Sequence, residues 1–349
     1  MRYAIVTDTH AGVRNDAKAF ADYQDRFWIN TFFPTCKKNG IKKIKHLGDF
    51  FDKRQHLTIK TMENVKNTFC RLLDEYDMTM DLIVGNHDVL YRNTNEANSV
   101  GNFFHGYPRV NVITTPVKIG NILMVPWINR ENYDDSIAAI ESTDADYCAG
   151  HFEISGFEMH RGQVATSGLD SSIFSKFKLT MSGHFHTRSR VGDITYLGNN
   201  CEFTWADVND PRGFHIFDDE TGELEHFVNP ESMFFRVEYD KCTSETMWIP
   251  YDPVEYKDTF IKVIATGEGS SYDLEQWRKD VVEHGPSELQ IIESSVMTEG
   301  INISEYEDHA AKSNIELIYE YVNGLTAADY VKESVMKYMN SLYVEAEAK

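Results

Sequence analysis

The chain has 349 residues, a hydrophobic content of 42% and a formal net charge of -21. This length predicts more than one hydrophobic core, and the apolar content excludes wholesale disorder. No apolar run approaches the roughly 20 residues that span a bilayer, the first residues do not resemble a signal peptide, and five scattered cysteines without a CxxC pair exclude a disulfide framework. We therefore expect a globular, cytoplasmic protein that does not cross a membrane.

The negative charge is concentrated in the last third of the chain. Residues 1–230 hold 24 Lys+Arg and 31 Asp+Glu, whereas residues 231–349 hold 10 and 24. Affinity for nucleic acid comes largely from Lys and Arg, so the overall acidity by itself argues against a nucleic-acid-binding protein. Carboxylates that bind metal ions are neutralised, however, so the net charge does not describe a metal site.

Up to about residue 230, short apolar runs rich in β-formers alternate with helical patterns, which predicts an α/β domain. Apolar side chains recur at helical spacing over residues 18–36 and 58–75. Buried strands are expected at residues 3–7, 43–47, 81–84, 110–114, 122–125, 146–149, 179–181, 194–197 and 214–217.

The pattern changes after residue 230 to that of a small α/β unit. We expect strands at residues 234–239, 259–265 and 289–293, a helix at 272–284, and further helices from residue 304. The last of these carries an apolar stripe that either packs on the chain's own core or docks on a partner, and the pattern leaves both open. The predicted domains are residues 1–230, 231–300 and 301–349.

Five short motifs combine carboxylate, amide and imidazole side chains, and each comes at the end of an apolar run. They are Asp8-Thr9-His10, Gly48-Asp49-Phe50-Phe51-Asp52, Gly85-Asn86-His87-Asp88, Gly150-His151-Phe152-Glu153 and Gly183-His184-Phe185-His186. The carboxyl ends of parallel strands meet at one edge of a sheet, so these motifs can converge. Their side chains suit hard divalent cations, and two such ions about 3.5–4 Å apart support in-line phosphoryl displacement. One motif alone is more often structural, but the ordered set predicts a dinuclear phosphoesterase.

The order of the motifs resembles the pattern of the calcineurin-like metallophosphoesterase superfamily over residues 8–186. The resemblance implies a four-layer α/β/β/α sandwich with a small α/β cap and C-terminal helices. It puts Asp8, His10 and His186 on one metal, Asn86, His151 and His184 on the other, and Asp49 between them as a bridge. It makes His87 the catalytic residue that protonates the leaving oxygen or stabilises the transition state. Asp52 and Asp88 are expected to orient the ligands or His87.

Over nearly its full length the chain is similar to the SbcD nuclease family, the meiotic-recombination-eleven type. Within it, residues 84–88, 125–128, 182–187, 209–214 and 342–346 resemble the nuclease subunits of T4-type phage recombination endonucleases. The resemblance implies two Mn²⁺ ions, or Mg²⁺, and hydrolysis of DNA in double-strand-break repair, recombination or end processing, as a 3′–5′ exonuclease and single-strand endonuclease. The implied partner is an SbcC-like coiled-coil ABC ATPase, bound through the C-terminal helices to a nuclease homodimer within a heterotetramer. If the chain is phage-encoded, it acts in the host cytoplasm.

Basic residues beside the motifs are candidate contacts for DNA phosphates, with ordinary solvated charge as the equal alternative. They are Lys53, Arg54, Arg92, Arg188 and Arg190. Lys53 and Arg54 also superficially resemble the Arg that follows this motif in protein phosphatases. Two alternatives therefore stay open, a small-molecule phosphoesterase of the same superfamily and a metal-free scaffold, although none of the seven ligand positions is lost.

Overall fold

The computed structural model describes residues 1–160, 163–240, 246–247, 256–266 and 272–293. The helices expected from residue 304, together with their apolar stripe, lie outside the described residues. Within the described part of the chain, no helix is long and apolar enough to cross a membrane.

The first of two large sheets combines the N-terminal strands with a hairpin from much later in the chain. Its order is β14-β13-β1-β2-β3-β4, in which β1 to β4 run parallel and β13 and β14 run antiparallel to their neighbours. The strands are β1 (Arg2–Val6), β2 (Lys43–His46), β3 (Thr79–Ile83), β4 (Val110–Ile113), β13 (Gly213–Asp218) and β14 (Leu224–Val228). Ile5 pairs with His215, so the returning hairpin completes the sheet beside β1.

The second large sheet has the order β11-β12-β10-β7-β6-β5, with β6, β7, β10 and β12 parallel. Its strands are β5 (Val117–Ile119), β6 (Ile122–Val125), β7 (Tyr147–His151), β10 (Leu179–Gly183), β11 (Ser189–Val191) and β12 (Ile194–Tyr196). A short ribbon of β8 (Glu158–His160) and β9 (Gln163–Val164) lies outside both sheets. Side chains such as Ile5 and Ile83 from the first sheet pack with Met124 and Met181 from the second, so the two sheets share one core.

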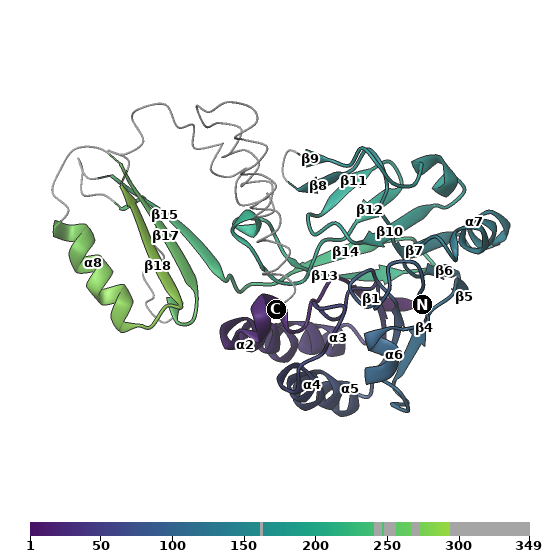
Figure 1. Ribbon diagram of the computed structural model, residues 1–349, viewed down its shortest axis with the longest axis horizontal. Coiled ribbons are helices and arrows are strands. Elements are labelled where there is room, and N and C mark those ends of the chain that lie inside the picture. The colour runs from purple at the N-terminus through teal and green to yellow at the C-terminus, as the bar shows by residue number, and fades with distance from the viewer. Residues whose placement is uncertain (161–162, 241–245, 248–255, 267–271, 294–349) are drawn as a thin grey trace, which may run out of the picture.

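Helices cover the outer faces of the two sheets, as Figure 1 shows. The first sheet is covered by α1 (Val13–Asp16), α2 (Lys18–Arg26), α3 (Phe33–Lys38), α4 (Ile59–Val65), α5 (Arg71–Glu75) and α6 (Ser99–Phe103), with π-helical turns η1 (Phe27–Phe32) and η2 (Lys66–Cys70). The second sheet is covered by α7 (Tyr133–Ser142) and the 3₁₀ turn η3 (Ser171–Phe174), and a further turn, η4 (Trp205–Asp207), precedes β13. The predicted four-layer α/β/β/α sandwich is therefore confirmed.

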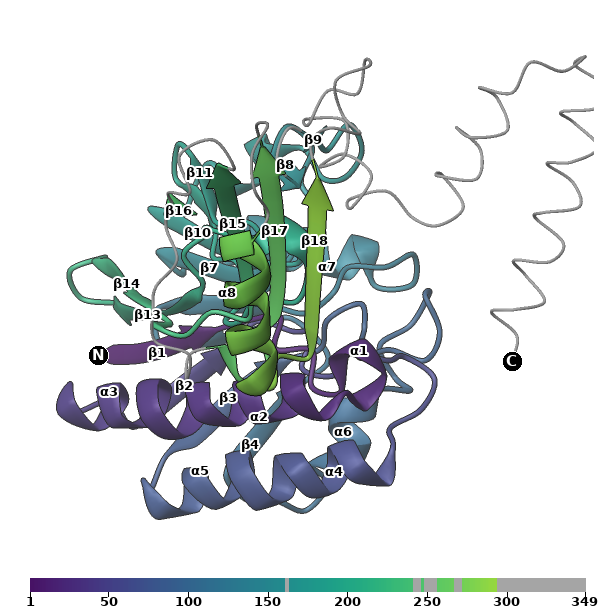
Figure 2. The ribbon, with the colours of Figure 1, turned by 90° about the vertical axis from the view of Figure 1, so that its left-hand side faces the viewer.

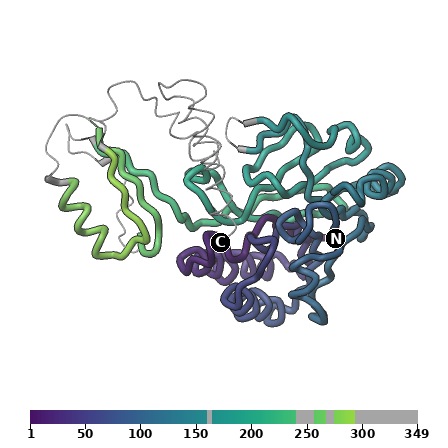
Figure 3. The backbone as a smooth tube through the Cα atoms, viewed as in Figure 1, coloured from purple at the N-terminus to yellow at the C-terminus, as the bar shows by residue number. Residues whose placement is uncertain are grey.

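A smaller sheet of order β16-β15-β17-β18 follows the sandwich, and Figure 3 traces the chain into it. Its strands are β15 (Phe234–Asp240), β16 (Thr246–Met247), β17 (Phe260–Thr266) and β18 (Glu288–Glu293). One face is covered by α8 (Tyr272–Glu283), seen in front of the strands in Figure 2. Phe234 and Phe260 join the sandwich core through Phe20, and Nζ of Lys262 lies 4.3 Å from the ring centroid of Trp205. These contacts attach the small α/β unit to the sandwich.

Candidate metal centre

The five motifs converge at one edge of the sandwich, where parallel strands of both sheets end. Asp8, Asp49 and Asn86 follow β1, β2 and β3 of the first sheet, whereas His151 ends β7 and His184 follows β10 of the second. This is the convergence expected for loops at the carboxyl ends of parallel strands. The site therefore depends on both sheets.

Backbone hydrogen bonds join the loops after β1 and β2. The amides of Asp8 and His10 donate to the carbonyl oxygens of Gly48 and Asp49, both at 3.1 Å. Asp8, His10 and Asp49 have φ angles of 51°, 44° and 53°, in the left-handed region that is strained for residues other than glycine. Such strain persists only where the surroundings hold the backbone, and it is concentrated at functional sites.

Two glycines allow these loops to approach one another closely. A Cβ added to Gly85 would lie 2.2 Å from the amide nitrogen of Asp49, and one added to Gly183 would lie 2.0 Å from the hydroxyl of Thr7. Both distances are far below contact distance, so no larger residue fits at either position without moving the loops. Gly85 and Gly183 thus allow the backbones that carry the ligands to lie close together.

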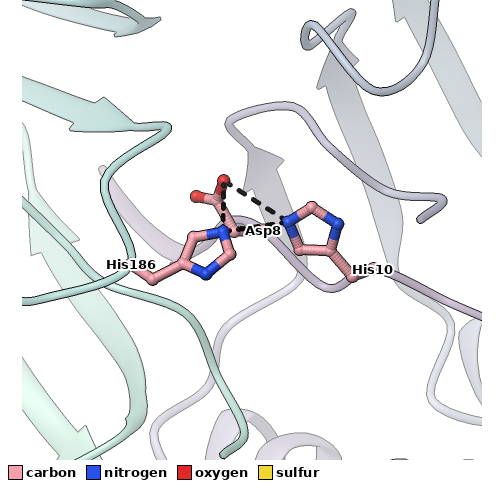
Figure 4. A group of neighbouring side chains, drawn as sticks. All are labelled: Asp8, His10 and His186. Carbon is pink, nitrogen blue, oxygen red and sulfur yellow. Dashed lines mark hydrogen bonds and ion pairs between the residues drawn. The ribbon is translucent and has the colours of Figure 1, made fainter. Parts of the chain in front are cut away.

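Asp8, His10 and His186 form the first group of potential metal ligands, shown in Figure 4. Oδ1 of Asp8 lies 4.0 Å from Nε2 of His10 and 3.9 Å from Nε2 of His186, and the two imidazole nitrogens are 3.0 Å apart. The hydroxyl of Thr7 and the amide of His184 donate to the buried Asp8 carboxylate. Three ligand atoms within 4.8 Å of one another are compatible with one cation.

Asp49, His151 and His184 form the second group, and Asn86 lies among them. Oδ1 of Asn86 is 2.8 Å from Nε2 of His151 and 2.9 Å from Nδ1 of His184. Oδ2 of Asp49 is 3.3 Å from Nε2 of His151 and also 3.9 Å from Nε2 of His10 in the first group. One carboxylate oxygen therefore faces both groups.

The partners of the two ring nitrogens of His151 indicate whether a cation fits the second group of ligands. Its Nδ1 donates to the carbonyl oxygen of Leu47 at 2.8 Å, so Nε2 of the neutral ring has a lone pair and no proton. That lone pair faces oxygens of Asn86 and Asp49, which are acceptors too, and buried acceptors facing one another are unfavourable unless positive charge lies between them. Burial opposes charging of His151, yet the Asp49 carboxylate raises its pKa to about 9, so in the metal-free site a proton on Nε2 supplies the positive charge that a cation would bring. The residues thus fit a bound cation.

His87 lies beside the first group and is partly exposed. Its Nδ1 donates to the carbonyl oxygen of Asp52 at 2.7 Å, and its ring meets that of His10 edge-on with centroids 4.9 Å apart. The carboxylate of Asp52 is 3.5 Å from Nδ1 of His10. Asp52 therefore contacts His87 through its backbone and His10 through its side chain.

The carboxylate of Asp88 is buried beneath the loops after β2 and β3. Its Oδ1 accepts the amides of Phe50 and Phe51 at 3.1 and 3.2 Å, and its Oδ2 accepts the amide of Gly85 at 2.9 Å. Burial raises the pKa of Asp88 to about 7, and the charge of Asp49 acts in the same direction. Asp88 thus holds the two backbones that carry Asp49 and Asn86.

Comparison with known proteins adds to this geometry. Residues 1–188 match the family model of the calcineurin-like phosphoesterases. The chain belongs to this family. It is also 31% identical, over 355 residues and 99% of both chains, to "Exonuclease subunit 1" of Enterobacteria phage T4. Among similar solved structures is a dimetal phosphatase from Danio rerio, with 11% identity and a TM-score of 0.40; the match covers 62% of this chain and 91% of that chain. Another is an archaeal phosphodiesterase, with 13% identity and a TM-score of 0.32; the match covers 66% of this chain and 100% of that chain.

As a calcineurin-like phosphoesterase, the protein is a metal-dependent phosphodiesterase, and its fold implies a dinuclear metal site. The two side-chain groups described above are the candidates for that site. A third grouping, of His10, Asp52 and His87, also lies within ligand distance and was not expected from the motifs. It shares His10 with the first group.

Of the five basic residues proposed from the sequence, Arg54 and Arg92 interact electrostatically with each other, whereas the other three have separate interactions. Burial lowers the pKa of Arg54, and the nearby charge of Arg92 lowers it further, whereas Asp49 opposes this. Within the described ranges neither arginine forms an ion pair with a carboxylate. Nζ of Lys53 donates to Asn15, and Nε of Arg190 donates to the carbonyl oxygen of Gly192. The charge of Arg188 acts on His215 and His226.

Two residues next to the site were given no role from the sequence. The buried guanidinium of Arg212 donates to the carbonyl oxygen of His186 and pairs with Asp207 at 2.7 Å. Trp127, just after β6, packs its ring 5.3 Å from that of His184. Both fall in stretches noted only for family resemblance, because local spacing does not show a contact between distant segments. A sequence signal of another kind, such as alignment of relatives, would be needed to find them.

Proposed function

We propose that the protein is a DNA nuclease that hydrolyses phosphodiester bonds with two divalent cations, Mn²⁺ or Mg²⁺. The position of the Asp49 carboxylate, facing both ligand groups, carries this proposal, because a shared carboxylate is how two cations come close enough to act on one phosphate. The likeness to a phage exonuclease subunit over 99% of both chains supports DNA as the substrate.

In this proposal each group holds one ion and Asp49 bridges them. The ligands are Asp8, His10 and His186 for one ion and Asn86, His151 and His184 for the other. When bound, the two ions supply a nucleophile from water at neutral pH and neutralise the charge that develops on the phosphate. The chain's own contribution is to keep the seven side chains in place through the strained loops, the close-packed glycines and the Asp88 carboxylate.

His87 protonates the leaving oxygen or stabilises the transition state. Its ring orientation is set by the hydrogen bond from Nδ1 to Asp52, which leaves Nε2 for the reacting phosphate. A histidine is suited to this role because its ordinary pKa lies near neutrality. Partial exposure of His87, beside the buried His10, agrees with a group that meets the substrate.

Arg54 and Arg92 bind backbone phosphates next to the metal centre. Two guanidinium groups near each other, with no carboxylate paired to either in the described structure, are favoured when an anion lies against them. Lys53, Arg188 and Arg190 are assigned contacts farther along the DNA. Residues 231–300 form the cap, which we also assign to DNA binding.

The active assembly contains an SbcC-like coiled-coil ABC ATPase and a nuclease homodimer within a heterotetramer. The phage T4 relative, which matches this chain over 99% of both chains, is named a subunit, and this supports an assembly of some kind. We assign residues 301–349 to the docking of the ATPase. A DNA-binding partner also accounts for a nuclease whose net charge is -21.

The proposal is tested by Mn²⁺-dependent digestion of single- and double-stranded DNA, with and without the ATPase partner. Wild-type protein should release nucleotides from 3′ ends and cut single strands, and Asp49→Asn should not. Asp144→Asn, on the exposed surface, is the matched control and should retain activity. A preference of orders of magnitude for a phosphomonoester or cyclic nucleotide over DNA would instead assign the site to small phosphoesters.

A further inference from the structure

Trp127 lies at the rim of the candidate metal centre, where β6 ends. Its ring centroid is 5.3 Å from that of His184 and 6.0 Å from that of His151. Phe203 contacts the other ligand group, with its ring centroid 5.8 Å from that of His10, but is only 3% exposed. Trp127 keeps part of its surface exposed, so it is the aromatic residue of the two that a substrate can reach.

The backbone of Trp127 is held on both of its polar sides. Its amide donates to the carbonyl oxygen of Val84 at 2.8 Å, next to the motif that carries Asn86. Its carbonyl oxygen accepts side-chain amides of Asn95 at 2.9 Å and Asn132 at 3.0 Å. A ring on so constrained a backbone presents a fixed surface, and a preorganised surface loses little entropy when it binds a ligand.

The contact between Asn95 and Trp127 also connects Trp127 to the loop that contains Arg92. Asn95 belongs to the loop that follows Asp88, and Asn93 of that loop donates to Glu131 at 2.8 Å, so residues 88–98 are fastened to residues 127–132. Arg92 lies in this fastened loop, and its charge acts on Arg54, which also interacts with the charge of Asp49. The contacts of its backbone thus connect Trp127 to the loop that carries Arg92.

A nucleotide has both a base that stacks on aromatic rings and a phosphate that binds guanidinium groups. We propose that Trp127 is the platform on which the base next to the scissile phosphodiester stacks, so that it favours nucleic acid over small phosphoesters. This inference rests on the proposed nuclease function and adds to it a residue that determines substrate preference. The competing role is purely structural, in which the ring only keeps His184 and His151 in position.

Assaying variants of Trp127 on three substrates separates the stacking role from the structural role. Wild type, Trp127→Phe and Trp127→Leu are assayed on a single-stranded oligonucleotide, on the same oligonucleotide with an abasic site beside the cleaved bond, and on glycerophosphocholine, a small phosphodiester without an aromatic ring. Stacking predicts that Trp127→Leu raises KM for the intact oligonucleotide by about fivefold to a hundredfold, with Trp127→Phe in between. It also predicts unchanged hydrolysis of the small diester, and equal KM values of wild type and Trp127→Leu for the abasic strand.

Tyr133→Leu is the matched control, since Tyr133 is an aromatic residue 49% exposed at the start of the nearby helix α7. It should leave KM for all three substrates unchanged. Equal losses of Trp127→Leu on the oligonucleotide and on the small diester would show a structural role and overturn the inference. An abasic penalty as large in Trp127→Leu as in wild type would overturn it too.

A binding measurement covers the case in which the variants do not fold. Fluorescence of 2-aminopurine, placed at successive positions of the strand, is followed as metal-free wild-type protein binds. Stacking predicts quenching at one position beside the cleaved bond, and no quenching at any position contradicts the inference. If wild type cleaves small diesters but no oligonucleotide, the nuclease function fails together with this inference, whereas DNA cleavage without the stacking pattern rejects the inference alone.

Discussion

Oδ2 of Asp49 lies 3.3 Å from Nε2 of His151, although the two residues lie at the ends of strands in different sheets. Asp49 follows β2 of the first sheet and His151 ends β7 of the second, so this contact forms only when the two sheets face each other. A metal ion bound between them therefore binds the folded sandwich and not the unfolded chain. Fold and metal site should stabilise one another.

Mn²⁺ should raise the melting temperature of the protein, and a chelator should lower it. Ligand present at about 100 times its Kd stabilises a folded protein by about 2.7 kcal/mol. Asp49→Asn should lose most of this shift because it weakens both ion sites, whereas Asp144→Asn should keep it. Scanning calorimetry of the chelator-treated and Mn²⁺-loaded proteins measures the shift. Identical melting curves with and without Mn²⁺ would contradict metal binding at this site.

Replacement of His87 by Asn should lower kcat for DNA by about a hundredfold to ten-thousandfold, the usual contribution of proton transfer by a positioned side chain. His87 is outside the two ligand groups bridged by Asp49, so the number of bound ions should stay unchanged. Steady-state kinetics together with metal analysis of the purified variant measure both. Loss of an ion from His87→Asn would make His87 a ligand instead.

Arg92→Ala and Arg54→Ala should each weaken DNA binding about equally for all sequences, because phosphate contacts do not read bases. The dependence of log K on log salt should become shallower by about one for each variant. Arg71→Ala is the control, since Arg71 is exposed on α5 and paired with Glu75. Fluorescence anisotropy over a salt series gives the slopes. A slope for Arg92→Ala equal to that of Arg71→Ala would remove Arg92 from the DNA path.

Gly85→Ala should destabilise the protein and abolish activity, since its Cβ would lie 2.2 Å from the Asp49 amide nitrogen. Overpacking of this kind costs about 1–3 kcal/mol, and here it displaces the bridging carboxylate. Gly156→Ala meets no atom within 4 Å and should retain activity, with only the strain of its positive φ of 88°. Urea unfolding and DNA digestion compare the two. Full activity of Gly85→Ala would show that the loops separate without consequence.

Glu202→Gln should change stability increasingly as the pH rises from about 4.5 to about 7, and fully above that. Burial raises the pKa of Glu202 to about 7, although its Oε2 accepts the amides of Met233 and Phe234. Because this value lies above the ordinary 4.5, the stability that Glu202 contributes is complete below about pH 4.5 and is lost as the pH rises through 7. Glutamine stays neutral and keeps an oxygen acceptor.

Urea unfolding at pH 4.5 and pH 8 measures this difference. At pH 8 the free energy of unfolding of Glu202→Gln should exceed that of wild type by an amount on the order of 1–3 kcal/mol, and at pH 4.5 the two should be similar. The same difference at both pH values would mean that Glu202 does not titrate between them. The result also reports on the junction with the small sheet, because the two amides begin β15.

The strands and helices were largely predictable because their patterns are local. The strand expected at 122–125 is β6, and those expected at 43–47 and 110–114 are β2 and β4 with the last residue removed. The helices expected at 18–36 and 58–75 contain π-helical turns, which helical periodicity does not reveal. The pairing of β13 with β1 was not predictable either, since the two strands lie far apart in the sequence, at the start and near the end of the sandwich domain.

The candidate ligands could be predicted because each lies in a short motif with a recognisable order. The structure brings together all seven proposed ligands, with His87 beside them, whereas the basic residues are only partly gathered. Arg212 and Trp127 were not predictable in the same way. Their importance comes from contacts with His186 and His184, across segments that sequence spacing does not connect.

The central claim, two cations sharing Asp49, is tested most directly by diffraction from crystals grown with Mn²⁺, recorded at the manganese absorption edge. We predict two anomalous peaks about 3.5–4 Å apart, with the Asp49 carboxylate in contact with both. A single peak, or no peak at millimolar Mn²⁺, would contradict the dinuclear site.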